Sequence, residues 1–528
     1  MAEVFVADAA PGRPTASGRP VPARLLMAAL IGPLLVLLPI IYTVLQATRV
    51  GGAAAIELLA RPLVGELLVN TIGLVAAATA AAALVGTAAA WFVERTELPG
   101  RRAWAVLSAV PLAVPPFVSS YAWVSLSPAF QDFAGAWLVV TCAYYPLVYL
   151  PVAAALRGLD PTLEETARSL GENGWGCFRR VVLPQLRPAL FGGMLLVALN
   201  VLVEFGAFAL LRFRTFTTEL FAEYRTGFNG PSASLIAVVL LALCLICLFA
   251  EMKVRGGARY ARLGRGVRRK AILQPLGAAR LPVLVGFVLL VTATLGVPLG
   301  MIAYWLTQHG PAAITPAEVS VSMLADAALA SLWLGMTGAA LTVALAVPLG
   351  FLVVRYRGRV ITLLERTAYL AQGVPGIVVA LALISLTIHD AYPLYQTATL
   401  LIVAYAIVFL PLALVSVRAA LAQAQPALEE AGRSLGLGWA GVIWRIVLPL
   451  AGPGLGAAAA LVFASIVTEL TATLLLAPIG TQTLATQVWA DTSTLAFAAA
   501  APYAALMIGL SFLSAWLLAR RFAVMRFV

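Results

Sequence analysis

Residues 164–184 read EETARSLGENGWGCFRRVVLP, and residues 429–449 read EEAGRSLGLGWAGVIWRIVLP. Both copies begin with a pair of glutamates, continue through Arg-Ser-Leu-Gly and reach Leu-Pro after the same number of residues. The interval between them is about half the length of the chain, which has 528 residues. One polar element is therefore present once in each half of the sequence.

The rest of the sequence is strongly apolar. Hydrophobic residues make up 62% of the chain and charged residues 11%, and the mean hydropathy is +0.96. A soluble globule of this size needs more polar surface than that. Many segments reach the roughly 20 apolar residues that a helix needs to cross a bilayer, and their patterns favour helices over a β-barrel. We expect an all-α polytopic membrane protein.

Twelve membrane spans are predicted. Residues 1–23 are rich in Ala, Pro and Gly and are interpreted as a disordered cytoplasmic tail. The run that follows is too long for the apolar core of a signal peptide and is interpreted as an uncleaved first span. The expected spans are residues 25–46, 67–93, 104–127, 134–156, 189–211, 233–251, 282–306, 329–354, 367–388, 396–417, 454–476 and 497–519.

Basic residues predict the orientation of these spans. If the N-terminus is cytoplasmic, 30 of the 35 Lys and Arg residues lie on the inner side. Cytoplasmic loops carry such an excess of positive charge. We therefore expect both ends of the chain and both Glu-Glu copies to be cytoplasmic. The five basic residues left outside are Arg49, Arg61, Arg212, Arg214 and Arg225.

The spans form two parallel repeats. Residues 24–252 and 281–528 are expected to be membrane domains of six spans each, and an even number of spans gives both domains the same orientation. Pro146 and Pro411 are separated by the same interval as the two polar copies. The basic segment 253–280 between the domains is interpreted as a cytoplasmic linker held by charge and anionic headgroups, with a specific ligand site as the alternative.

The residues of each copy predict two short helices joined by a turn. In the first copy, Pro161 suits the first turn of a helix, and Glu164 and Glu165 lie near its positive end, where a carboxylate is favourable by roughly 0.3 to 1 kcal/mol. Gly171 supplies the left-handed residue that ends such a helix. A second helix is expected to begin near Trp175 and to stop at the closing proline, where the chain re-enters the membrane.

An amphipathic loop lying on headgroups could explain a single copy. Many sequences would satisfy that requirement, however, whereas here the same acidic pair and the same Arg-Ser-Leu-Gly recur at one spacing. The repetition favours a shape that a partner protein binds twice.

These residues resemble a known motif. The order Glu-Ala-Ala, three residues, Gly, nine residues, Ile-x-Leu-Pro is the coupling-loop motif of the inner-membrane permease subunits of binding-protein-dependent ABC importers. Here it reads Glu165-Thr166-Ala167 to Pro184 and Glu430-Ala431-Gly432 to Pro449, with one small-residue position changed in each copy. The chain resembles the fused two-domain type found among ferric-iron importers.

The resemblance implies a function and its partners. Two cytoplasmic ATPase subunits would bind the coupling loops, and an extracytoplasmic binding protein would deliver the solute across the bacterial inner membrane. Ferric iron is the expected solute, and thiamine, phosphonate and polyamine are alternatives. The implied coupling residues are Glu164, Glu165, Ala167, Gly171, Leu183, Pro184, Glu429, Glu430, Ala431, Gly436, Leu448 and Pro449.

The chain is not expected to be an enzyme itself. It has only two lysines, Lys253 and Lys270, and neither lies in a Gly-x4-Gly-Lys-Ser/Thr phosphate loop. ATP and Mg would therefore be used by the partner subunits, and this chain would bind no cofactor or nucleic acid. A secondary transporter with parallel repeats is the alternative from another class, but it would not need two identical docking loops.

Two acidic residues lie within expected spans. Glu204 and Glu469 are separated by the same interval as the two polar copies, and each follows the closing proline of its copy at the same distance. A carboxylate near the bilayer centre costs on the order of 3 kcal/mol, so it should face the bundle interior or a water-filled path. One interpretation is a structural hydrogen bond at the interface of the halves. The other is that the pair faces each other across the translocation path.

The remaining candidate functional residues are the histidines, the outer loops and the cysteines. His309 and the His389-Asp390 pair fall at outer ends of spans and are interpreted as solvated. The outer loops near 214–228 and 481–491 are expected to dock the binding protein. The cysteines suggest neither a disulfide framework nor a metal site, and no catalytic constellation is visible.

Overall fold

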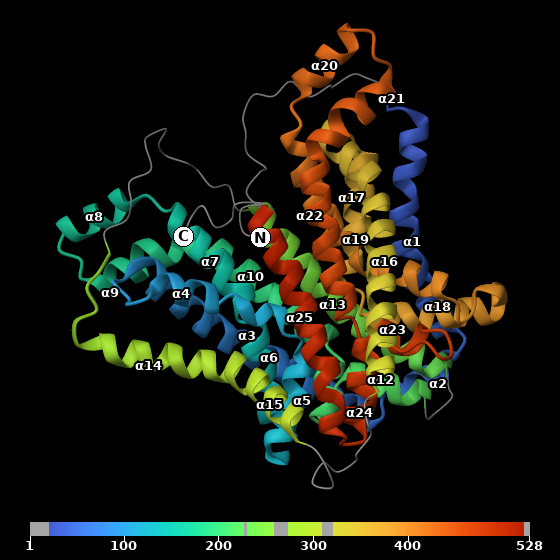
Figure 1. Ribbon diagram of the computed structural model, residues 1–528, viewed down its shortest axis with the longest axis horizontal. Coiled ribbons are helices and arrows are strands. Elements are labelled where there is room, and N and C mark those ends of the chain that lie inside the picture. The colour runs from blue at the N-terminus through green and yellow to red at the C-terminus, as the bar shows by residue number, and fades with distance from the viewer. Residues whose placement is uncertain (1–20, 226–229, 258–272, 309–319, 522–528) are drawn as a thin grey trace.

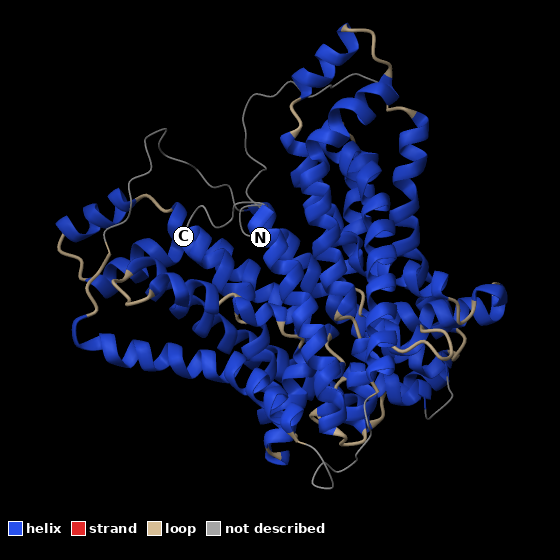
Figure 2. Ribbon diagram, in the orientation of Figure 1, coloured by secondary structure: helices blue, strands red, loops and turns tan. Residues whose placement is uncertain are grey.

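The computed structural model describes residues 21–225, 230–257, 273–308 and 320–521, and these residues fold into helices and short connections (Figures 1 and 2). Within those ranges, β pairing is confined to one isolated bridge between Thr96 and Gln274. This agrees with the all-α expectation. In a bilayer, a helix is favoured because it satisfies its own backbone hydrogen bonds.

The helices follow a similar order in both halves, except that α6 and α7 of the first half correspond to the single helix α19 of the second. The first half contains α1 (Ala23–Thr48), α2 (Gly52–Leu59), α3 (Pro62–Arg95), α4 (Arg101–Leu107), α5 (Pro116–Leu126), α6 (Phe133–Tyr144), α7 (Pro146–Gly158), α8 (Pro161–Ser169), α9 (Gly174–Cys177), α10 (Leu183–Val203), α11 (Gly206–Leu210), α12 (Phe216–Arg225) and α13 (Gly230–Gly257). The second half contains α14 (Arg280–Val291), α15 (Val297–Thr307), α16 (Val321–Arg355), α17 (Arg359–Leu370), α18 (Gly376–Asp390), α19 (Ala398–Gln423), α20 (Pro426–Ser434), α21 (Trp439–Val442), α22 (Leu448–Val467), α23 (Thr471–Leu476), α24 (Leu484–Ser493) and α25 (Phe497–Arg521).

The described residues include 10 helices that are long and apolar enough to cross a membrane, and up to 12 if two bent helix pairs each count as one span. The bent pairs replace two of the expected straight spans, 104–127 and 367–388. Their bends measure 94° before α5 and 103° before α18. Prolines account for both bends, because Val114 before Pro115 and Val374 before Pro375 have extended backbone with ψ of 114° and 111°. The residue before a proline is disfavoured in the helical conformation.

The expectation that each second short helix stops at its closing proline is wrong. A π turn over Phe178–Val182 joins α9 to α10, and the corresponding turn over Ile443–Val447 joins α21 to α22. Each proline therefore lies just after the π turn, in the first turn of the α-helical segment that follows. The second short helix of each loop element and the span form one continuous rod.

The first helix of each half packs against the other half. α1 contacts α16 and α18, and the Tyr42 hydroxyl donates to the Ser385 carbonyl at 3.2 Å. In the reverse direction, Phe287 of α14 lies 5.3 Å from the ring of Trp104 in the first half. This exchange ties the two halves together through apolar side chains.

The two short polar helices α8 and α20 lie far apart in Figure 1, at the left edge and at the top of the view. The helices of the two halves meet instead at the opposite end of the molecule. There the Tyr121 hydroxyl of α5 donates to the Phe497 carbonyl of α25 at 2.8 Å, and the rings of Phe205 and Trp489 lie 5.4 Å apart. The two polar helices α8 and α20 are thus widely separated, whereas the halves are in direct contact at the opposite end.

A close glycine contact provides a test of the packing in the first half. A Cβ on Gly86 of α3 would lie 2.8 Å from the Tyr145 carbonyl oxygen, whereas a Cβ on Gly73 of the same helix would meet nothing within 4 Å. We expect Gly86→Ala to lower the stability of the purified protein by about 1–3 kcal/mol, because the backbones must move apart. Thermal unfolding in detergent measures the effect. Gly73→Ala is the matched control, and an equal loss in both variants would contradict the packing.

Candidate functional site

The duplicated polar element has the same local structure in both halves. α8 ends at Ser169, and Gly171 follows with φ of +90°; α20 ends at Ser434, and Gly436 follows with φ of +85°. The Glu172 amide donates to the Ala167 carbonyl at 3.1 Å, and the Leu437 amide donates to the Gly432 carbonyl at 3.0 Å. These bonds, with the left-handed glycine, satisfy the last carbonyls of each helix. The predicted glycine turn is confirmed in both copies.

The two glutamates of each pair point in different directions. Glu164 and Glu429 are buried, whereas Glu165 and Glu430 are exposed. Ala167 is buried with Glu164 because residues three apart share a helix face. In the second copy the buried partner is Gly432, while Ala431 is exposed. The expected docking set therefore divides into an inward and an outward face.

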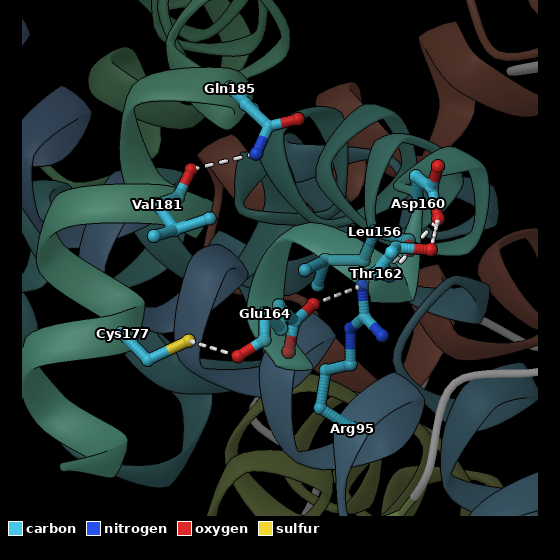
Figure 3. Close-up of polar contacts among 8 residues, drawn as sticks. All are labelled: Arg95, Leu156, Asp160, Thr162, Glu164, Cys177, Val181 and Gln185. Atoms are coloured by element: carbon cyan, nitrogen blue, oxygen red, sulfur yellow. Dashed lines mark hydrogen bonds and ion pairs between the residues drawn. The ribbon is translucent and has the colours of Figure 1, made fainter. Parts of the chain in front are cut away.

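The inward glutamates form ion pairs that the sequence analysis did not predict. Arg95 Nη2 lies 2.9 Å from Glu164 Oε1, and Arg355 Nε lies 2.7 Å from Glu429 Oε1 (Figure 3 shows the first pair). A signal for them was present. Each arginine is the last residue of a long apolar segment, and the interval between the two is the same as that between Pro115 and Pro375.

The outward face of each element carries leucines. Leu170 and Leu435, just before the glycine turns, are 81% and 84% exposed. Leu163 and Leu428 are also exposed on the helices themselves. Contiguous exposed apolar side chains rimmed by polar residues mark interaction surfaces. We call Leu163, Glu165 and Leu170, with Leu428, Glu430 and Leu435, the two outward patches.

The remaining predicted residues of the element lie where it enters the membrane. Leu183 and Pro184 begin α10, and Leu448 and Pro449 begin α22. The Gln185 side-chain amide donates to the Val181 carbonyl at 2.9 Å across this junction (Figure 3). These residues shape the junction of loop and span and lie outside the outward patches.

The two membrane glutamates lie at helix breaks. The expected spans 189–211 and 454–476 are interrupted, because α10 ends at Val203 and α22 at Val467, and the short helices α11 and α23 follow. The side chain of Glu204 accepts the Ala207 amide at 3.0 Å, and that of Glu469 accepts the Ala472 amide at 3.0 Å. Each carboxylate thus caps the positive end of the next helix.

The breaks meet at the interface of the halves. A Cβ on Gly206 would lie 2.7 Å from Leu470 Cδ2, so the residues that follow the two glutamates are in close contact. Glu204 also accepts the Tyr144 hydroxyl at 2.7 Å. The structure brings the two segments together and engages both half-buried carboxylates in caps. Their role in a translocation path stays a prediction.

A cavity of about 220 Å³ lies at the joined end of the halves. Among its lining residues Arg212 is the one with a charged side chain, and aromatic rings form much of the wall. Arg212 and Leu495 both adopt left-handed backbone conformations, with φ of +53° and +64°. The lining comes from both halves: Tyr121, Val124, Gln131, Phe205, Ala209, Leu210, Arg212, Thr218, Phe221, Trp489, Thr492, Ser493, Leu495 and Phe497.

The other candidates lie around this end. His389 is exposed and contacts the Ser385 carbonyl at 2.7 Å, and Asp390 accepts the Tyr42 hydroxyl at 3.3 Å. His309 lies outside the described residues, as do 226–229 of the first outer loop. In the second loop, burial raises the pKa of the Asp491 carboxyl to about 6.

Comparison with known proteins places the chain in context. Residues 82–254 and 343–522 match the family described as binding-protein-dependent transport system inner membrane component. An Fe(3+)-transport system permease protein of Haemophilus influenzae is 39% identical over 482 residues, which cover 91% of this chain and 95% of that protein. A sulfate transport system permease protein of Escherichia coli is 32% identical over 238 residues, 41% of this chain and 86% of that protein. A ferric transport system permease protein of Actinobacillus pleuropneumoniae is 28% identical over 66% of this chain and 56% of its own length.

The glycine turn of the first copy can be tested through Cys177. This thiol is buried against the Glu164 carbonyl at 3.9 Å. Gly171→Val should cost about 1–2 kcal/mol at a left-handed position and loosen the turn. We expect a water-soluble maleimide to label Cys177 faster in this variant, with the other cysteines replaced by serine. Gly158→Val, at a position with φ outside the left-handed region, is the control. Equal labelling rates in both variants would contradict the role of the turn.

Proposed function

We propose that this chain, which belongs to the family of binding-protein-dependent transport system inner membrane components, carries ferric iron and works with two ATPase subunits and a binding protein. It is a multi-pass membrane permease of the ABC-importer type. The observation that carries the proposal is the pair of outward patches, because each half presents one copy of the same surface. Two copies suit two identical partner subunits, one below each half.

The outward patches have the chemistry of a docking surface. Leu170 and Leu435 project from the glycine turns with more than four-fifths of their surface exposed. Glu165 and Glu430 add an exposed negative charge to the same short helices. At protein interfaces, side chains that become fully buried at the centre supply most of the binding energy, and a polar rim surrounds them. Each patch would enter a cleft of one ATPase subunit.

The shape suits alternating access. α8 and α20 are far apart, whereas the other ends of the halves are joined through Tyr121 and Phe497 (Figure 1). Closure of an ATPase dimer on ATP would bring α8 and α20 together and separate the joined end. We infer that the patches face the cytoplasm, because the Lys and Arg residues concentrate on that side of the predicted topology.

Ferric iron is supported by similarity along the whole chain. The Haemophilus influenzae Fe(3+)-transport permease matches 91% of this chain, including both halves. The sulfate permease of Escherichia coli matches 41%. In the proposed path, Glu204 and Glu469 would lie next to the passing species, since their helix breaks meet at the interface of the halves.

Docking can be tested with charge reversal. We expect Glu165→Lys combined with Glu430→Lys to reduce co-purification of the ATPase subunits and solute uptake by about tenfold or more. Insertion and thermal stability should be unchanged, because both side chains are exposed. Glu97→Lys is the control, since Glu97 is an exposed acid that follows α3 outside the patches. Full uptake and full ATPase binding in the double variant would refute the docking assignment.

The substrate can be tested by uptake into cells. Cells that produce this chain with its ATPase and binding protein should accumulate radiolabelled ferric iron and should not accumulate labelled sulfate. An ATPase variant unable to hydrolyse ATP should abolish uptake. Accumulation of sulfate without iron would overturn the substrate, and iron uptake that persists without ATP hydrolysis would overturn the ATP-driven mechanism.

A further inference from the structure

An arginine anchors the loop helix to the long helix in both halves. Arg95 is the last residue of α3, and Arg355 is the last residue of α16. Their partners, Glu164 and Glu429, lie in the first turns of α8 and α20. The same contact therefore joins equivalent elements twice, at similar separations in sequence. Such repetition in two divergent halves indicates a shared requirement.

Each arginine donates hydrogen bonds to backbone carbonyls in addition to pairing with its glutamate. Arg95 Nη2 also donates to the Leu156 carbonyl at 3.1 Å, near the end of α7 (Figure 3). Arg355 Nη2 donates to the Leu421 carbonyl at 3.3 Å, near the end of α19, and to the Ala424 carbonyl at 2.6 Å just beyond it. A cation at a helix end also interacts favourably with the negative pole of the helix. Three elements of each half thus converge on one guanidinium group.

Burial distinguishes these pairs from others in the chain. The side chains of Arg95 and Glu164 are 3% and 9% exposed, and those of Arg355 and Glu429 are 12% and 5% exposed. The pair between Arg157 and Glu94 is different, since the arginine is 52% exposed. Separating the two charges of a buried pair is unfavourable because water cannot replace either partner, so the pair keeps one geometry. An exposed pair contributes little to stability.

The long helices lead from these arginines to the helix breaks. α3 packs against α7 and α10, and α16 packs against α19 and α22. The contacts are close at glycines: a Cβ on Gly193 of α10 would lie 2.8 Å from the Leu147 carbonyl oxygen, and one on Gly335 of α16 would lie 2.9 Å from Phe463. Such tightly packed helices move as rigid units. α10 and α22 end beside Glu204 and Glu469.

We propose that Arg95 and Arg355 are positioning residues that transmit movement of the docking helices α8 and α20 into the membrane helices. This inference rests on the proposed function, because it names the contacts through which the movement caused by ATPase closure would reach the membrane helices. Docking itself belongs to Glu165 and Glu430, which face outward. Glu164 and Glu429 face inward and complete the mechanical link. Docking and transmission are therefore carried by neighbouring residues of one helix, one exposed and one buried.

The test separates transmission from docking. Arg95→Lys combined with Arg355→Lys keeps both charges but loses the planar group that reaches the glutamate and the carbonyls together. In reconstituted complexes we expect normal ATPase binding and continued ATP hydrolysis, with solute transported per ATP falling by about tenfold. Arg157→Lys, in the exposed pair, is the matched control and should transport normally.

A charge exchange provides the second variant. Arg95→Glu with Glu164→Arg, made together, should recover part of the transport per ATP that Arg95→Glu alone loses, because the ion pair is restored in reverse. Wild-type transport per ATP in the Arg→Lys double variant would overturn the proposal. So would loss of ATPase binding in that variant, since the arginines would then serve only to shape the docking surface. Failure of the unmodified chain to bind any ATPase would instead refute the proposed function.

Discussion

The buried ion pair between the end of a long helix and the start of a loop helix is the constraint on which the rest of the structure depends. It links α8 and α20 directly to the ends of the long helices α3 and α16, whereas their other contacts are with the second short helices and π turns of the same loop elements. Removing one partner of a buried pair costs about 3–5 kcal/mol, because the other charge is left uncompensated. Arg95 and Arg355 therefore hold Glu164 and Glu429 on the inward side of each loop helix. The exposed residues Glu165, Glu430, Leu170 and Leu435 take no part in these pairs.

The helix breaks are a second consequence of backbone chemistry in a bilayer. Each break exposes amides that water cannot reach, and a carboxylate is a suitable acceptor for them. The carboxylates of Glu204 and Glu469 accept hydrogen bonds from the amides of Ala207 and Ala472. Each charge, which is unfavourable in the membrane, thus provides an acceptor for an amide that would otherwise have none. The same residues stand where the halves meet. A structural cap and a lining role are compatible in one residue, because a capped carboxylate still has lone pairs to offer.

The sequence predicts much of this arrangement, because its signals are local. Apolar length predicts spans, and the spacing of Gly171 and Gly436 predicts turns, which the structure confirms. The predictions that were wrong or incomplete concern the π turns, the two bends and one contact between residues that are distant in the sequence. Nothing near Pro184 indicates the π turn that lets the helix continue past it. The prolines before α5 and α18 were available as a signal, but the two segments were predicted as straight spans. Both glutamates of each pair were predicted to belong to one docking surface. In the structure, Glu164 instead pairs with Arg95, which lies in a much earlier helix of the chain. A comparison of Arg95 with Arg355 across the two halves could have found that contact.

The central claim is that movement of the loop helices toward each other separates the joined end of the halves. Spin labels on Ser169 and Ser434, next to the glycine turns, would measure the first distance. In a second sample, labels on Gln131 and Ser493, which line the cavity at the joined end from the two halves, would measure the second. The background would have its four native cysteines replaced by serine. In complex with the ATPase, addition of ATP under conditions that block hydrolysis should shorten the first distance and lengthen the second. Shortening of the first with no change in the second would contradict the account.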